Sequence, residues 1–186
     1  MTRLTMILIA LAATFWSPSA LAQANDADRE RLDRLLGDLA DPEAANVPRL
    51  TNDIARIWAR SGSDTADLML ERGREAMDGG NFIVAVEHFT ALINHTPDFA
   101  EAWNARATAY FLMGEFGLSV ADISQTLALN PRHFGALAGL GMIYEEIGQP
   151  EQAYAAFRAA QVLNPHMENV NRAVTRLTLS GIGRPI

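Results

Sequence analysis

The sequence of 186 residues contains no cysteine and no lysine, and it has 15 arginines. Without cysteine there are no disulfides, no thiolate metal ligands, no cysteine nucleophile and no lipidated N-terminal cysteine. Without lysine, Schiff-base chemistry and lysine acetylation are excluded. The formal net charge of −7 argues against nucleic acid as the main partner. The remaining composition, 49% hydrophobic and 20% charged, is typical of one globular domain with a core.

Long hydrophobic runs are also missing outside the first 22 residues. That segment has a basic residue, Arg3, then an apolar run over Leu4–Trp16 and a small-x-small sequence at Ala20–Ala22, which is the pattern of a secretory signal peptide. The apolar run is shorter than the roughly 20 residues that a membrane-spanning helix needs. We therefore expect residues 1–22 to be a signal peptide cleaved after Ala22, periplasmic localisation, and no membrane span in the mature chain. An uncleaved membrane anchor is the alternative.

Motifs for catalysis and cofactor binding are missing as well. The sequence has no H-E-x-x-H, no zinc-site spacing and no G-x-S-x-G. Gly135, Gly139 and Gly141 form G-x-x-x-G-x-G inside a predicted helix, whereas a phosphate loop needs G-x-G-x-x-G after a strand. We expect no catalytic residue, no metal and no cofactor. The four histidines are then expected to be solvated or to cap helices: His88, His95, His133 and His166.

What the sequence does contain is a repeat. Three glycines are spaced by 34 residues and three prolines by the same interval, which defines the windows 66–99, 100–133 and 134–167. Each glycine is expected to end a first helix in the left-handed conformation, and each proline to stop a second helix. These glycine turns and proline stops predict helices over 66–78, 82–95, 99–112, 116–129, 133–146 and 150–163. The three glycines are Gly80, Gly114 and Gly148, and the three prolines are Pro97, Pro131 and Pro165.

Small and aromatic residues follow the same register. The second window carries Trp103 and Tyr110, and the third carries Gly141, Tyr144 and Phe157. The pattern resembles the tetratricopeptide repeat (TPR), a helix-turn-helix unit of 34 residues. The resemblance implies an all-α fold, an α-solenoid of antiparallel helix pairs that stack into a superhelix. Three units are clear, and in the third Gly141 is expected to let two helix backbones approach closely.

The flanks of the three windows are predicted to cover the ends of the array. Residues 23–65 are interpreted as an N-terminal helical pair containing a degenerate repeat, because Pro48 falls in the same register as Pro150. Asp64 or Thr65 is expected to cap the next helix, and Asn81 the one after it. Residues 168–186 are predicted to form a capping helix and a loose tail, since a solenoid must cover its last apolar face.

Two arginines stand where the family usually buries leucine. Arg72 and Arg106 occupy the seventh position of successive windows. A buried charge without a partner costs about 3–5 kcal/mol, so each is expected to pair with a carboxylate or to extend into solvent. Asp122 is the predicted partner of Arg106.

The resemblance also implies a binding surface. In TPR proteins the first helix of each repeat lines a concave groove that holds a peptide or a helix of a partner. The chaperone-binding members clamp a C-terminal carboxylate with lysine, asparagine and arginine, but this chain has Leu70, Arg74, Ala105, Gly135 and Gly139 at those positions. We expect instead a segment with a large apolar residue flanked by basic ones. The candidate groove residues are Asp67, Glu71, Arg74, Asn104, Thr108, Phe111, Gly135, Gly139, Met142 and Glu145.

The functional prediction is a non-catalytic protein–protein interaction scaffold of the cell envelope, with a protein or peptide partner. Two alternatives stay open. One is a self-associating assembly component, which would be a homo-oligomer, and the other is an enzyme or regulator with an unrecognised site.

Overall fold

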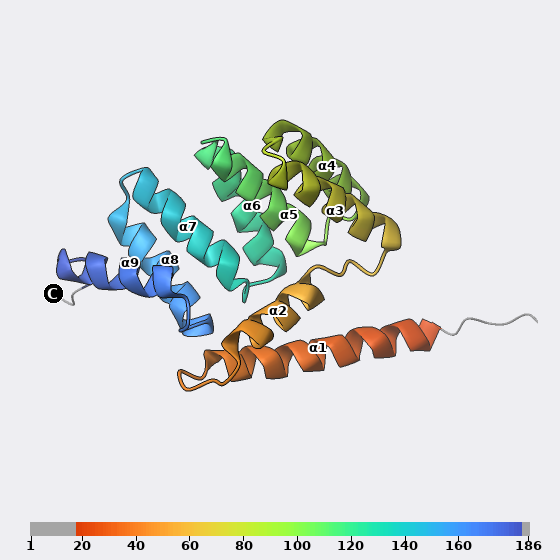
Figure 1. Cartoon of the computed structure of the whole chain (residues 1–186), viewed down its shortest axis with the longest axis horizontal. Helices are drawn as coiled ribbons and strands as arrows, with labels where there is room; N and C mark the ends of the chain where they lie inside the picture. The colour runs from red at the N-terminus through yellow and green to blue at the C-terminus, as the bar shows by residue number, and fades with distance from the viewer. Residues whose placement is uncertain (1–17, 184–186) are drawn as a thin grey trace, which may run out of the picture.

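The computed structural model describes residues 18–183, which form nine helices joined by short loops (Figure 1). No strand occurs in this range. The helices are α1 (Pro18–Ala40), α2 (Val47–Trp58), α3 (Asp64–Asp78), α4 (Phe82–His95), α5 (Ala100–Leu112), α6 (Phe116–Leu129), α7 (Phe134–Glu146), α8 (Pro150–Leu163) and α9 (Glu168–Leu179).

Helices α3 to α8 form three stacked antiparallel pairs, as the repeat predicted. Every observed helix end in this part lies within two residues of the predicted one. Gly80, Gly114 and Gly148 follow the first helix of each pair with φ of 73°, 76° and 72°, so each turn uses the left-handed conformation that favours glycine. The α-solenoid of helix pairs is confirmed.

Small residues allow the two helices of a pair to approach. A Cβ atom built on Gly141 would lie 2.5 Å from Cδ1 of Phe157, and one on Gly73 would lie 2.2 Å from Cε1 of Phe89. Both aromatic rings are fully buried. The close approach predicted for Gly141 is therefore confirmed, and Gly73 does the same in the first pair.

Arg106 has the partner that the sequence predicted. Its Nε and Nη2 donate to Asp122 at 2.7 Å and 2.9 Å, and its Nη1 donates to Oγ1 of Thr90 at 3.0 Å. The hydrogen bond to Asp122 raises the pKa of Arg106 above its usual value. One arginine thus joins α4, α5 and α6. Arg72 is exposed, which is the other outcome expected for this position.

One predicted helix cap is wrong, and another stands at the predicted position without the expected hydrogen bond. Ser63, and not Asp64 or Thr65, precedes α3, and its Oγ accepts a hydrogen bond from the backbone N–H of Ala66. Ser63 has the extended backbone that an N-cap requires, whereas Asp64 already belongs to the helix. Asn81 precedes α4 but makes no side-chain cap hydrogen bond.

The N-terminal helix pair is present, but it does not continue the array as a preceding repeat would. In the described part of the chain, only Ala59 from the residues before Ser63 packs against the core of α3 and α4. The α1–α2 hairpin lies instead along the edge formed by the start of α7 and the loop between α8 and α9 (Figure 1). Its own core, formed by Leu36, Leu39 and Ile54, is continuous with Phe134. The hairpin thus packs on residues that are distant in sequence rather than on the adjacent repeat.

The C-terminal helix covers the last pair of the array, as predicted. Helix α9 buries Val170, Ala173, Val174 and Leu177 against α8. Within residues 18–183, no helix combines the length and the apolar character that crossing a membrane requires. Most of the predicted signal peptide, residues 1–17, lies outside the described residues, and the expected cleavage site after Ala22 falls within α1.

Candidate functional site

An apolar pocket lies between the first helices of the second and third pairs. It encloses about 360 Å³ between α5 and α7, with contributions from α6 and from the start of α9. Six of the ten candidate residues meet here, although they come from two separate repeats. These are Asn104, Thr108, Phe111, Gly135, Gly139 and Met142.

The pocket is open because two of its wall residues have no side chain. A Cβ atom on Gly139 would meet its nearest neighbour, Cδ1 of Ile123, at an ordinary contact distance of 3.8 Å. At Gly135 the nearest atom would be Cε1 of His133, at 3.4 Å. Met142 is 40% exposed, and a flexible thioether at this place can adapt to a bound group. The pocket therefore has room for one bulky side chain.

A second, more polar pocket adjoins the first. It encloses about 330 Å³ between α3 and α5, and Arg74, Met77, Asp78 and Glu101 contribute to its walls. Asn104 and Thr108 belong to both pockets. The two pockets therefore form one surface across α3, α5 and α7, which we call the groove.

Glu101 is the centre of the polar part of the groove. Its Oε1 accepts from Nη2 of Arg74 at 2.6 Å, and its Oε2 accepts from Nδ2 of Asn104 at 3.4 Å. The same Oε2 lies 3.1 Å from Nε2 of His133. The Glu101 side chain is only 13% exposed, so these contacts hold the carboxylate in place. The sequence gave no indication that three groups converge on Glu101.

The tautomer of His133 follows from its two hydrogen bonds. Its Nδ1 accepts from the backbone N–H of Ala136 at 3.0 Å and so caps the start of α7. A nitrogen that accepts a hydrogen bond carries no proton, so Nε2 carries the proton and donates it to Glu101. His133 is 4% exposed. It is a capping histidine, one of the two roles predicted from the sequence.

The charges differ between the two ends of the groove. At the α3 end, Glu71 and Asp78 are exposed, and neither forms an ion pair within the described residues. At the α7 end, Glu145 pairs with Arg176 of α9 at 2.8 Å, so its charge is balanced. The α3 end thus carries free negative charge.

Three candidate residues line neither pocket. Asp67 accepts hydrogen bonds from the backbone N–H of Ser61 at 2.8 Å and from its Oγ at 2.6 Å, which organises the turn before α3. Glu71 is exposed on α3, and Glu145 makes the ion pair described above. Their part in binding stays a prediction.

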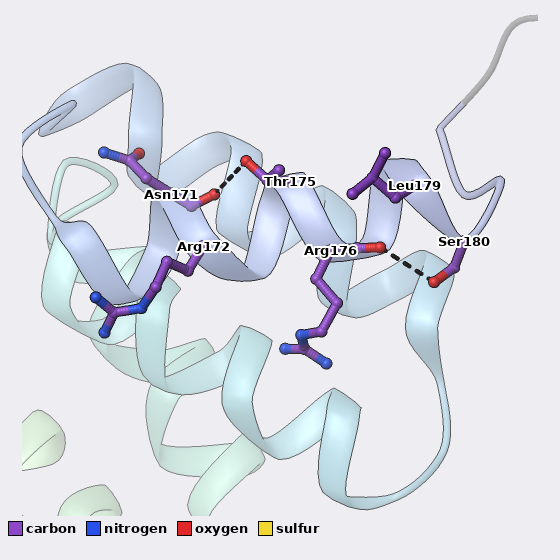
Figure 2. A pocket seen from close by; sticks show the side chains of 6 residues that line it. All are labelled: Asn171, Arg172, Thr175, Arg176, Leu179 and Ser180. Atoms are coloured by element: carbon purple, nitrogen blue, oxygen red, sulfur yellow. Dashed lines mark hydrogen bonds between the residues drawn. The ribbon is translucent and has the colours of Figure 1, made fainter.

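The sequence predicted α9 as a capping helix alone, but α9 also borders the groove. Asn169, one period after Gly135, lines the apolar pocket. A shallow hollow of about 570 Å³ lies along α9, and Arg172 and Arg176 project on the same side of the helix (Figure 2). Extending the interval of 34 residues by one more unit would have placed these side chains on the groove face.

The hollow itself is lined by α9 alone (Figure 2). Its hydroxyl groups are already bonded within the helix, since Thr175 donates to the carbonyl oxygen of Asn171 at 2.9 Å and Ser180 to that of Arg176 at 3.1 Å. Among the described residues, no group of three or more His, Cys, Asp and Glu side chains could hold a metal ion.

Comparison with known proteins identifies the family. A family model described as "Tetratricopeptide repeat" matches residues 70–118 and 104–168, and the chain belongs to this family. Repeats of this kind are interaction modules for protein partners.

Relatives in sequence carry the same repeat. The chain is 34% identical over 137 residues to a TPR repeat-containing protein of Rhizobium etli, an alignment that covers 72% of this chain and 66% of that protein. It is 26% identical to the small glutamine-rich tetratricopeptide repeat-containing protein 2 of Saccharomyces cerevisiae, over 63% of this chain and 33% of that protein. A third or more of each relative's length is thus unmatched.

Solved structures share the fold. The first TPR of Spaghetti (RPAP3), bound to an HSP90 peptide, has a TM-score of 0.60 at 20% identity and covers 62% of this chain and 91% of that one. The secretion chaperone SycD of Yersinia enterocolitica, in complex with a peptide of the translocator YopD, has a TM-score of 0.61 at 15% identity, over 64% of this chain and 96% of that one.

Proposed function

We propose that the protein is a non-catalytic scaffold of the cell envelope whose concave groove binds a segment of a partner protein. The segment places one bulky apolar side chain in the pocket between α5 and α7. The observation that carries the proposal is this pocket of about 360 Å³, which Gly135 and Gly139 leave open on a surface otherwise lined by apolar and small polar side chains.

Structures of the same fold support a peptide as the ligand. Both the Spaghetti domain and SycD were solved with a peptide bound. The lysine and asparagine residues that clamp a terminal carboxylate are absent here, so the ligand differs in chemistry. Asp78, which is exposed and lines the polar pocket, favours a basic group beside the apolar anchor.

A substitution that fills the pocket tests this proposal. In Gly139→Leu the new side chain occupies the space of the anchor, and its Cβ atom would meet only Cδ1 of Ile123, at 3.8 Å. Losing the burial of one aromatic side chain, about 1.5–3 kcal/mol, should weaken binding by about tenfold or more. The measurement is calorimetric titration with a synthetic peptide that carries one phenylalanine flanked by arginines.

Gly117→Leu is the matched control. Gly117 also lies in a helix, a Cβ atom there would meet nothing within 4 Å, and it lines no part of the groove. We expect this variant to bind as the wild type does. If Gly139→Leu folds normally and binds the peptide equally well, the groove is not the binding site.

We also propose that the protein acts after export. The support is the sequence of residues 1–22, with its basic start, apolar run and small-x-small end. Fractionation followed by N-terminal mass spectrometry should find a chain that begins at Gln23 in the periplasmic fraction. A chain with an intact Met1 in the cytoplasmic fraction would contradict this part of the proposal.

A further inference from the structure

A continuous chain of contacts joins the α1–α2 hairpin to the groove. The indole ring of Trp58, at the end of α2, stacks on the imidazole of His133 with 4.4 Å between centroids and 19° between planes. His133 contacts Glu101, and Glu101 contacts Arg74 at the distances given above. Within this chain, Trp58 belongs to the hairpin, whereas Glu101 and Arg74 line the groove.

Three contacts fix the orientation of His133. Trp58 covers its face, Ala136 donates to Nδ1, and Glu101 accepts from Nε2. Because His133 is buried, its Nε2–H would lose the hydrogen-bond partner that it has within the protein if Glu101 moved away. The ring would then turn or shift, and the stack with Trp58 depends on where the ring lies.

The other contacts between the hairpin and the array do not involve Glu101. Arg132 pairs with Asp33 at 2.5 Å, and Nε2 of His166 lies 2.9 Å from the carbonyl oxygen of Asp41. Trp58 also packs against Phe134, at 5.0 Å between centroids. The hairpin therefore stays attached when the contact between His133 and Glu101 is lost, but its attachment weakens at the end of α2.

We propose that docking of the α1–α2 hairpin is coupled to the state of the groove through the relay Trp58–His133–Glu101. A ligand that engages Arg74 or Asn104 acts on the carboxylate that positions His133, and so strengthens hairpin docking. By thermodynamic linkage, hairpin docking strengthens ligand binding by the same factor. Trp58 is thus a positioning residue for a groove that it does not line. The ligand side of this inference rests on the proposed function.

Hydrogen exchange without ligand tests the coupling first. In Glu101→Ala, the backbone amides over Ile54–Trp58 should exchange about fivefold faster or more, as expected for a coupling of ordinary size. Glu101→Gln should restore slow exchange, because its amide oxygen still accepts from Nε2 of His133. Unchanged exchange in Glu101→Ala would overturn the proposal.

Glu145→Ala is the matched control. Glu145 also stands at a groove position and pairs with an arginine, but it has no contact with the relay. Exchange of α2 should stay at the wild-type rate in this variant. If it rises as much as in Glu101→Ala, the effect is general loosening, and the relay is refuted.

The reciprocal arm uses the phenylalanine–arginine peptide. Trp58→Leu should weaken its binding about fivefold or more, the factor expected from linkage. Trp58→Phe should bind as the wild type does, because phenylalanine keeps the stack and Nε1 of Trp58 is buried without a hydrogen-bond partner. Equal affinity of Trp58→Leu and wild type would contradict the coupling. If no variant binds the peptide, the proposed function fails, and the exchange result alone decides the relay.

Discussion

At the scale of single residues, contacts set by the position in the repeat could be predicted from the sequence, whereas contacts between distant elements could not. Arg106 and Gly141 could be interpreted from the sequence because each occupies a place whose neighbours recur every 34 residues. Asp122 lies one helix further along in the same window, which made the ion pair predictable. His133 could not be assigned in this way, since its cap, its carboxylate partner and its stacking partner come from three different elements.

Alanine substitutions at two glycines of α7 should have opposite effects on stability, because helix propensity dominates at one position and packing at the other. Alanine gains up to about 1 kcal/mol over glycine inside a helix. Gly139→Ala should therefore stabilise the protein by about 0.5–1 kcal/mol, because its Cβ meets only Ile123 at 3.8 Å. Gly141→Ala should lower the free energy of unfolding by about 1–3 kcal/mol, because its Cβ would lie 2.5 Å from Phe157.

Chemical denaturation of both variants measures these changes, and each serves as the control for the other. The contrast matters more than either value, since both substitutions make the same chemical change in one helix. Shifts of the same sign would show that the open pocket and the close helix contact have been assigned to the wrong glycines.

At the scale of helices, local patterns fixed the ends but not the partners. Glycine turns and proline stops act within a few residues, so the bounds of α3 to α8 followed from the sequence. Ser63 was missed as a cap because Asp64 and Thr65 are equally good capping residues on composition alone. The docking of α1 and α2 depends on contacts such as Arg132–Asp33, which joins residues 99 positions apart and has no local pattern.

The difference between local patterns and distant contacts also explains why the sequence did not relate α9 and Trp58 to the groove. The candidate residues of α5 and α7 were identified because the repeat assigns groove positions in those helices. Helix α9 carries the next set of groove positions, but these were not recognised because the repeat pattern is weaker after Met167. Trp58 lies on a helix outside the array, so no property of the repeat could relate it to the groove.

At the scale of the whole molecule, the proposed binding site lies on one face of a stacked helical array. The first helices of the pairs present two adjoining pockets, one apolar and one polar, while large apolar side chains such as Leu118 are exposed elsewhere. Such exposed residues could form a competing surface. The face that the partner contacts is therefore the claim on which the other proposals depend.

Site-specific photocrosslinking tests that claim most directly. A benzophenone amino acid replaces either Met142, which is 40% exposed in the groove, or Leu118, which is 50% exposed on α6 and lines no part of it. The probe is the peptide with one phenylalanine flanked by arginines. The proposed groove site predicts a crosslink from position 142 that disappears in Gly139→Leu, and none from position 118. A crosslink from position 118 alone, or equal crosslinks from both positions, would contradict it.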